Sequence, residues 1–320
     1  MSDFSGFGFF LLIIIAITVF PFVMASRRRK RKSGKLCVFV ACKEEPFIEE
    51  FCDYYLSQGA DMIFVFDDKS VNQAVYKNLD LNPSVRIIRG GLQIPDGNGN
   101  HLSGVIQDYY KNEIQPHYEW CINVDADEFI TTKRDPLKTI KDELKTTFRD
   151  VDCIKVPWVM MAHNQRKKKP QSLLLENTWR WCHDKEHKNQ VTEVRKFRCR
   201  FESIEVKSIF KTEKFGKLKP HMPIAEKKLR LSIGRLAIVD SINFEKQGGG
   251  SLYVGLREKH IAEGYLVCYH YRIYSEEHAL QKINTSVFPP YRNGFLAELL
   301  SCDYAELEDK TMQEKFKRLR

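Results

Sequence analysis

The sequence lacks the short motifs that define several common protein classes. Its nine cysteines form no CxxC pair and their number is odd, so we do not expect a zinc finger or zinc ribbon. No GxxxxGK[ST] stretch occurs, which excludes a P-loop nucleotidase. We find no internal repeat. The 320 residues and the apolar content are those of one large globular domain or two ordinary ones.

An excess of positive over negative charge is also lacking outside one segment. The formal net charge is +9, but six of the basic residues are consecutive, at positions 27–32. Without that run the chain is close to balanced. A basic face over the whole protein is therefore not expected, and neither is a nucleic-acid partner.

Residues 4–25, which precede this basic run, carry no charge. Their length of about 22 residues matches what a helix needs to cross a bilayer core. The alternative is a cleaved signal peptide, since VMA before Ser26 is a tolerable cleavage site. Against it, the N-terminal flank lacks positive charge and the apolar run is too long. We expect a single-pass anchor with a short tail over 1–26 and a basic juxtamembrane stem over 27–35.

The charge bias predicts how this anchor is oriented. Because the basic residues follow the apolar run, the positive-inside rule places residues 27–320 in the cytosol. The same basic run would attract anionic lipid headgroups. Cysteines scattered through expected strands agree with a reducing compartment. One sequon, Asn284-Thr285-Ser286, points to the opposite side of the membrane.

From residue 36 the chain alternates between apolar runs and amphipathic segments. The runs predict strands at 36–41, 62–66, 85–90, 120–124 and 153–160. The intervening segments predict helices at 44–61, with Gly59 at its C-terminal cap, at about 71–79 and at 102–114. This alternation is typical of an α/β fold whose mostly parallel sheet is flanked by helices.

The second half is less periodic. We expect a helix at 136–148, a loop-like region at 161–225, and strands within 239–243, 252–256 and 265–274. A helix capped by Ser275 follows. Another helix is expected from about Asp303, with Tyr304, Leu307 and Phe316 facing inward.

An acidic cluster directly follows the fourth strand, in the stretch WCINVDADEFI. Two adjacent carboxylates repel each other, so Asp125 and Asp127 are expected to share a cation. Carboxylate oxygens together with phosphate oxygens suit Mg²⁺ or Mn²⁺. Ligands of such sheets bind at the carboxyl ends of strands, where Asp67 and Asp68 also lie. The plainer alternative is an acidic, solvated turn.

Four ordered segments carry a resemblance to a known family. They are FVACKEEPFIEEFCDYYLSQGADMIFVFDDKS, EWCINVDADEFI, PWVMM and CYHYRIYSEEH. Together they resemble GT-A glycosyltransferases, and more narrowly glycosyltransferase family 92 and related family 2-like proteins with a DxDEF motif. The resemblance covers residues 36–290, so we expect a GT-A-like domain over 36–300 and a C-terminal helix over 301–320.

The resemblance implies roles for individual residues. Asp125 and Asp127 would hold the metal, with Asp125 also contacting the nucleotide, and His270 would be a further metal ligand. Glu128 would orient these carboxylates or bind substrate as a catalytic residue, or it is simply an acid at the start of a helix. Asp67 and Asp68 would bind the nucleoside, and Glu44 would line the nucleotide pocket. Lys43 stands where the family has Asn, which leaves the base and ribose contacts open.

Other residues keep two interpretations. His270 and His221 are metal or diphosphate contacts, or packed core histidines. Trp158 stacks on a sugar or belongs to the core. The basic loop 166–169 attracts an acidic ligand or is simply solvated. The base beside the acceptor stays open among Asp184, Glu186 and Glu193.

The function expected from the resemblance is a membrane-anchored, metal-dependent glycosyltransferase. It would move a hexose from a nucleotide sugar, a UDP-sugar first of all, to a hydroxyl of a glycan, glycoprotein or glycolipid, with inversion. Relatives in animals and plants would be expected in the Golgi lumen, whereas the charge bias predicts a cytosolic domain. The alternative function is a catalytically inactive, membrane-tethered module that binds a sugar or a protein partner.

Overall fold

The computed structural model describes residues 32–90, 104–187, 203–225, 236–285 and 296–318. Its core is a ten-stranded sheet, with a small two-stranded sheet beside it. The strands are β1 Leu36–Cys42, β2 Met62–Asp67, β3 Val85–Arg89, β4 Trp120–Asn123, β5 Glu128–Thr132, β6 Cys153–Met160, β7 Trp179–Arg180, β8 Ser203–Lys211, β9 Ile238–Asp240, β10 Leu252–Val254, β11 Leu266–His270 and β12 Leu307–Glu308.

The large sheet is mixed, which corrects the expectation of a mostly parallel one. Its main path runs β3-β2-β1-β4-β8-β6-β11-β5, with β10 paired to β8 and β9 to β6. Strands β1 to β4 pair in parallel, as expected for successive strand–helix units. Strand β8 is antiparallel to both β4 and β6, and β5 is antiparallel to β11. An α/β fold is confirmed, and its large sheet contains both parallel and antiparallel strand pairs.

Strand β8 is the largest element that the sequence analysis missed. It lies in the centre of the sheet, inside the region 161–225 that we expected to be loop-like. Its sequence SIEVKSIFK carries lysine and serine among the apolar residues, so it does not form an apolar run. All seven of its inner residues are nevertheless buried. A polar strand in the core indicates that its polar side chains have buried partners.

The helices are shorter than the sequence suggests. They are α2 Ile48–Ser57, α3 Gly104–Tyr109, α4 Ile140–Lys145, α5 Leu173–Glu176, α8 Glu258–Glu263, α9 Glu276–Thr285, α11 Leu296–Leu300 and α12 Thr311–Lys317. The helix expected at 71–79 is replaced by two 3-10 turns, Gln73–Tyr76 and Leu79–Leu81. The helix expected from Asp303 begins only at Thr311, after β12. Phe316 faces inward as expected, and Ser275 caps α9 through the His278 N–H.

Helix α2 packs its aromatic face onto the sheet. Tyr54 and Tyr55 are buried and donate hydrogen bonds to the carbonyls of Ile130 and Glu128 in β5. The helix ends at Ser57 with Gln58 as its C-cap, and Gly59 follows with a φ of +90°, which favours glycine. A Cβ at Gly59 would also lie 2.7 Å from Cβ of Lys141.

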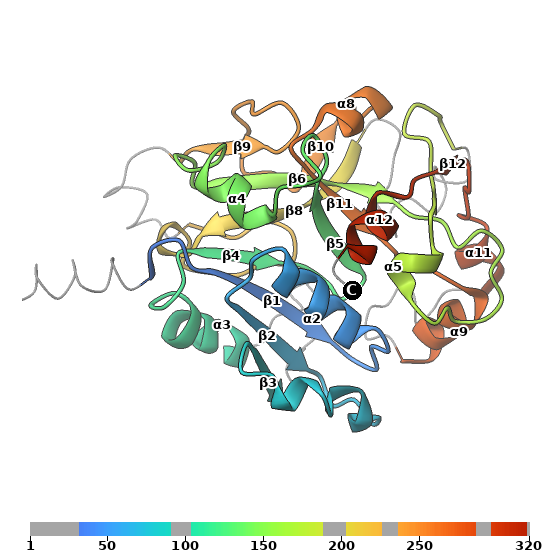
Figure 1. Ribbon diagram of the computed structural model, residues 1–320, viewed down its shortest axis with the longest axis horizontal. Coiled ribbons are helices and arrows are strands. Elements are labelled where there is room, and N and C mark those ends of the chain that lie inside the picture. The colour runs from blue at the N-terminus through green and yellow to red at the C-terminus, as the bar shows by residue number, and fades with distance from the viewer. Residues whose placement is uncertain (1–31, 91–103, 188–202, 226–235, 286–295, 319–320) are drawn as a thin grey trace, which may run out of the picture.

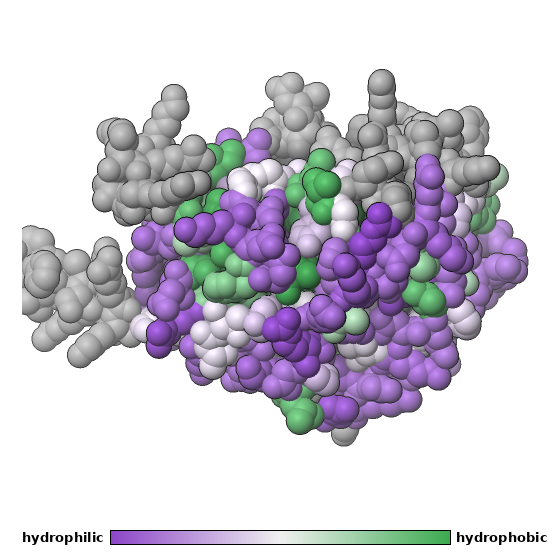
Figure 2. Space-filling view, turned by 90° about the horizontal axis from the view of Figure 1, so that it is seen from above, coloured by the Kyte–Doolittle hydropathy of each residue, from purple (hydrophilic) through white to green (hydrophobic). Residues whose placement is uncertain are grey.

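Helices α5, α9 and α11 gather at one end of the sheet, close to where β1 ends (Figure 1). The face seen from above is mainly hydrophilic, with apolar residues in small separate patches (Figure 2). Within the described segments, no helix has the length and apolar character needed to span a membrane. The expected anchor at 4–25 and residues 27–31 of the basic run lie outside the described residues.

The C-terminal segment is tied to the sheet by a buried ionic network around Asp309. Its carboxylate accepts hydrogen bonds from Arg180 Nε at 2.9 Å, Tyr269 Oη at 2.8 Å and Lys133 Nζ at 3.2 Å. Arg180 also pairs with Glu258 at 2.7 Å. Burial disfavours the charge, but Lys133, Thr311 and Arg180 outweigh it and hold the pKa of Asp309 well below its ordinary value.

Asp309→Asn is expected to lower the free energy of unfolding by about 2–3 kcal/mol, because the buried Arg180 and the partly buried Lys133 lose a charged partner. Chemical denaturation of the purified protein measures this loss. The matched control is Glu308→Gln, an exposed neighbour that pairs only across the surface with Lys310. Equal effects of the two substitutions would show that the buried network adds nothing to stability.

Candidate functional site

The acidic cluster forms a tight turn between β4 and β5. The Glu128 N–H donates to the Asp125 carbonyl at 3.1 Å, and the Asp125 N–H donates to Glu128 Oε2 at 2.7 Å. Strand β5 then pairs with β11, so that Glu128 lies opposite His270. The Tyr271 N–H donates to the Asp127 carbonyl at 2.8 Å. The turn is thereby held between the carboxyl ends of β4 and β11.

A buried lysine of β8 lies beneath this turn. Lys207 has a fully buried side chain, and its Nζ lies 2.8 Å from Asp125 Oδ2 and 3.0 Å from Glu128 Oε2. It also donates to the Pro220 carbonyl at 3.1 Å. Asp125 turns outward, with 58% of its side chain exposed, whereas Glu128 is completely buried. The orienting or catalytic role of Glu128 stays a prediction.

Burial and mutual pairing set the protonation of Lys207, Asp125 and Glu128. Burial opposes the charge on Lys207, but Asp125 and Glu128 outweigh it and raise the pKa of Lys207 well above its ordinary value. The surrounding protein disfavours a charge on Asp125 too, yet Lys207 holds the pKa of Asp125 below its ordinary value. Burial raises the pKa of Glu128. Lys207 and Asp125 are therefore an ion pair at neutral pH.

Asp127 faces a second lysine and a histidine. Its Oδ2 accepts from Lys282 Nζ at 2.7 Å, and its Oδ1 lies 3.6 Å from His270 Nε2. Lys282 also donates to the Arg272 carbonyl at 2.6 Å. Burial, followed by the charges of Lys282 and Arg272, holds the pKa of His270 well below its usual range. His270 is thus neutral, which is the form that binds a metal.

These residues fit a divalent cation only in part. Asp127 Oδ1 and His270 Nε2 are a carboxylate and a neutral imidazole that face each other. Mg²⁺ is commonly held by one or two protein ligands together with substrate phosphates. In the described part of the chain, however, no three His, Cys, Asp or Glu side chains are grouped to hold a metal. The donors suit a metal shared with a bound diphosphate.

The acidic residues at the end of β2 are bonded to the loop that follows. Asp67 is buried and accepts from Ser70 N, Tyr76 Oη and Gln73 Nε2. Burial opposes its charge, but these hydrogen bonds lower the pKa of Asp67. Asp68 is also buried, and its N–H donates to the Cys42 carbonyl at 2.9 Å. These are the contacts of turn-forming residues, and their nucleoside roles stay predictions.

Glu44 is linked both to this loop and to α9. Its carboxylate accepts from the N–H groups of Val71 and Asn72, and its carbonyl accepts from Gln281 Nε2 at 2.8 Å. The next residue of α9, Lys282, contacts Asp127. Helix α9 thus contacts both the segment after β1 and the acidic cluster.

The residues with two interpretations fall mostly into the packed interior. Trp158 is buried, with its ring centroid 4.3 Å from that of His270 and 5.5 Å from that of His221. His221 Nε2 lies 3.3 Å from Glu205 Oε2. Trp158 therefore belongs to the core beneath the cluster.

The basic loop lies against acidic side chains. Arg166 pairs with Glu176 at 3.0 Å, and Lys167 with Glu276 at 2.7 Å. The loop therefore has acidic partners within the protein. Among the base candidates, Asp184 accepts from the Glu258 N–H at 3.2 Å, Glu186 is exposed, and Glu193 lies outside the described residues.

Sequence reasoning missed three charged residues of the site, namely Lys207, Lys282 and Glu45. Glu45 lies beside the residue that the resemblance singled out. Burial, followed by the charge of Asp127, raises the pKa of Glu45 to about 7. The one sequence signal for Lys207 is a charge inside the run VKSIF. Neither Lys282 nor Glu45 carries a signal of its own, because each is an ordinary residue of a helix or loop.

Glu45→Gln is expected to stabilise the protein at pH 8 but not at pH 4.5. A carboxyl whose pKa is raised on folding binds a proton in the folded state between pH 4.5 and about 7. Stability is therefore lost as the pH rises through this window. The gain above pH 7 is at most about 3 kcal/mol, because each pKa unit corresponds to about 1.4 kcal/mol. Melting temperatures at several pH values measure it.

The matched control is Glu49→Gln, an exposed glutamate in the first turn of α2. It should show no comparable gain on going from pH 4.5 to pH 8. If Glu45→Gln gives the same difference at both pH values, Glu45 is not held in its neutral form by the site.

Comparison with known proteins adds little at this level of similarity. No family model matches the chain. No curated protein matches it either. Among solved structures, TarS 1–349 from S. aureus in complex with UDP is 16% identical with a TM-score of 0.29, covering 56% of this chain and 47% of that one. HddC from Yersinia pseudotuberculosis is 11% identical, with a TM-score of 0.32 and coverage of 64% and 88%.

A mycobacterial protein is 11% identical, with a TM-score of 0.34 and coverage of 67% of both chains. The chain spans about half the length of the TarS chain bound to UDP. Likeness this low carries no argument about activity. The geometry of the site has to support the function by itself.

Proposed function

We propose that this protein is a membrane-anchored, metal-dependent glycosyltransferase that uses a nucleotide sugar, with a UDP-sugar as the first candidate. The observation that carries the proposal is the DAD turn at the carboxyl edge of the sheet. Asp125 opens to solvent there, and Asp127 faces both His270 and Lys282. Carboxylates, a neutral imidazole and an ammonium group in one place suit a nucleoside diphosphate that leaves with negative charge.

Each residue of the site would have its own role in such a transfer. Asp127 and His270 would hold Mn²⁺ or Mg²⁺, which when bound would offset the charge of the departing diphosphate. Lys282 lies beside them and is placed to donate to a phosphate oxygen. Lys207 holds Asp125 and the turn in position from below. The acceptor hydroxyl would attack the anomeric carbon directly, with inversion, as its proton passes to a carboxylate and the bond to the diphosphate breaks.

A place in glycosyltransferase family 92, with its GT-A-like fold, belongs to the proposal as well. Its support is that the four resembling segments surround one site. They form β1, α2 and β2, then β4 with the acidic turn, then the end of β6, and finally β11 with the start of α9. Asp127 and His270, from the second and fourth segments, are in contact range.

We also propose that residues 4–25 anchor the chain with the catalytic domain in the cytosol, on the charge pattern of residues 27–32. Asn284 is exposed on α9, so a glycan is sterically allowed there. Loss of a glycan-dependent mobility shift on Asn284→Gln in cells would place this domain in the lumen. A mobility that does not change with glycosidase treatment agrees with the cytosolic orientation.

A second candidate function has one observation in its favour. Both aspartates already pair with lysines of the same chain, at 2.8 and 2.7 Å. A closed set of internal ion pairs is what a catalytically inactive binding module would keep. The two functions differ in turnover, and that difference decides between them.

The test uses the full-length protein in detergent micelles. It is incubated with a panel of UDP- and GDP-sugars and Mn²⁺, and the release of nucleoside diphosphate is measured, with and without EDTA. Release from one donor that EDTA abolishes supports a metal-dependent transferase. A folded protein that neither releases nor binds any nucleotide leaves the binding module as the better account.

A further inference from the structure

A hollow lies beyond the carboxyl end of β6 and next to α5. Its volume is about 240 Å³, and its lining residues are Ala162, His163, Asn164, Arg166, Glu176, Asn177, Thr178 and Trp179. Pockets for drug-sized ligands usually measure roughly 300–1,000 Å³. This pocket is therefore of a size for a single small ring and not for a nucleotide.

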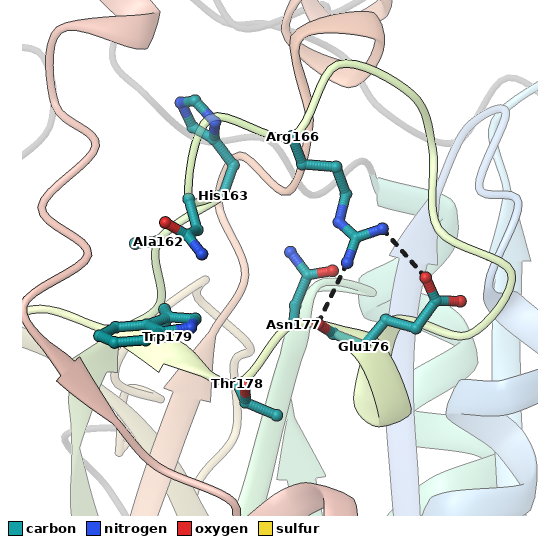
Figure 3. Close-up of a pocket in the computed structure, with 8 residues that line it drawn as sticks. Ala162, His163, Arg166, Glu176, Asn177, Thr178 and Trp179 are labelled. Carbon is teal, nitrogen blue, oxygen red and sulfur yellow. Dashed lines mark hydrogen bonds and ion pairs between the residues drawn. The ribbon is translucent and has the colours of Figure 1, made fainter.

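A buried side chain in this pocket has an unused hydrogen-bond acceptor. Asn177 is only 4% exposed, and its Nδ2 donates to the Tyr274 carbonyl at 3.2 Å. That contact fixes which end of the amide is the nitrogen. Its Oδ1 has no hydrogen-bond partner within the described residues. Figure 3 shows the amide pointing into the space bordered by Arg166 and Trp179.

A guanidinium group held in place lies across from this amide. Arg166 donates to Glu176 Oε2 at 3.0 Å and to the Glu176 carbonyl at 3.2 Å, as the dashed lines in Figure 3 mark. The Glu176 carboxylate neutralises its charge. The indole of Trp179 lies on another side of the pocket and offers an apolar surface.

This set of groups selects the chemistry of a ligand. An unpaired carbonyl oxygen requires a donor, so a phosphate or carboxylate would leave Asn177 unsatisfied. An ammonium ligand could donate to Asn177 but offers no acceptor to Arg166. Hydroxyl groups both donate and accept, so they satisfy Asn177 and Arg166 together. A neutral ring that carries hydroxyls and has one apolar face can bond to Asn177 and Arg166 and pack on Trp179.

The pocket is connected to the acidic cluster through the segment between β11 and α9. The Met161 N–H donates to the His270 carbonyl at 3.0 Å, just before the pocket residue Ala162. The Glu276 N–H, at the start of α9, donates to the Arg166 carbonyl at 2.9 Å. Asn177 is bonded to Tyr274 in the same segment. The pocket and the cluster thus lie on neighbouring strand ends.

We propose that this pocket binds one pyranose ring of the acceptor glycan, with Asn177 accepting from a sugar hydroxyl and Arg166 donating to another. The assignment to an acceptor rests on the proposed function. The assignment of a pyranose rests on the pocket alone. A glycan acceptor is favoured over a lipid or peptide hydroxyl.

The experiment records saturation-transfer NMR on the full-length protein in micelles, with methyl glycosides of glucose, galactose, mannose and N-acetylglucosamine as probes. At least one glycoside should bind with a dissociation constant on the order of 1–10 mM. Asn177→Ala and Arg166→Gln should each weaken binding about three- to tenfold. Arg166→Gln changes a partly exposed side chain, so it keeps the test valid if Asn177→Ala unfolds.

The matched control is Arg149→Gln, another arginine paired with one neighbouring carboxylate, at 3.4 Å from Asp150. It should bind the glycoside as the unmodified protein does. Absence of saturable binding by every glycoside up to about 50 mM overturns the proposal. Binding that both pocket variants leave unchanged overturns it as well.

A parallel measurement of UDP binding with Mn²⁺ and of donor turnover separates this proposal from the proposed function. Pocket-dependent glycoside binding without any nucleotide binding supports the pyranose site and rejects the transferase. Donor turnover whose acceptor KM is the same in Arg166→Gln and the unmodified protein rejects the pocket and keeps the transferase.

Discussion

Asp127→Asn is expected to lower nucleoside diphosphate release by about 100-fold or more, the scale of losing one electrostatic contact to a developing charge. The substitution keeps the shape of the side chain but removes its charge. Lys282 at 2.7 Å loses its anionic partner, and His270 at 3.6 Å faces an amide. A cation between Asp127 and a diphosphate would be held less tightly. The fall should appear in kcat as well as in kcat/KM.

The matched control for this loss is Asp150→Asn, the same substitution at an exposed site whose partner is Arg149. Its turnover should stay within about twofold of the unmodified protein, since exposed pairs of this kind contribute little. Melting temperatures of both variants show whether the fold is intact. If Asp127→Asn turns over at the rate of Asp150→Asn, the DAD turn is not the site of transfer.

The parts of the fold that the sequence predicts well are those with strong apolar runs. Strands β1, β2, β4 and β6 are buried along almost their whole length and lie where the runs predicted them. A strand covered on both faces needs apolar residues at nearly every position, so it is visible without an alignment. The directions of the strands are not visible in this way. The mixed sheet follows from β8, which pairs antiparallel on both sides.

The elements that sequence reasoning missed are polar inside. Strand β8 carries Lys207, and β5 begins with Glu128, both completely buried. A charged residue counts against a core strand unless its partner is known. That partner is in another part of the chain, here on the turn after β4. The same holds for the 3-10 turn at Gln73–Tyr76, where Asp67 accepts from Gln73 and Tyr76.

For the acidic cluster too, the features set by neighbouring residues could be predicted from the sequence, and the contacts with distant residues could not. Its place at a strand end could be predicted from WCINVDADEF, because a run of apolar residues stops there. The need for a cation could be predicted from the repulsion of two carboxylates. The sequence analysis expected a shared Mg²⁺ or Mn²⁺ there, and the structure places a separate lysine on each aspartate, Lys207 on Asp125 and Lys282 on Asp127. Those lysines come from β8 and α9, far from the cluster in sequence.

Lys207→Met should be the most destabilising of the substitutions considered, with a loss of about 3–5 kcal/mol in the free energy of unfolding. The methionine keeps the length of the side chain but leaves Glu128 without its ammonium partner in a fully buried position. Asp125 loses the 2.8 Å contact that holds its carboxylate. Differential scanning fluorimetry should show a melting temperature lower by about 5–15 °C, given the size of the domain.

Two further variants separate the charge effect from a packing effect. Lys211→Met makes the same change on the same strand, where the lysine is only partly buried and donates to the Arg149 carbonyl, and should cost less than about 1 kcal/mol. Glu128→Gln added to Lys207→Met removes the unpaired acid and should restore part of the lost stability. If the double variant is less stable than the sum of the single losses predicts, the losses come from poor packing of the new side chains and not from the unpaired charge. Lys207 would then be a packing residue instead of the cation that holds the DAD turn.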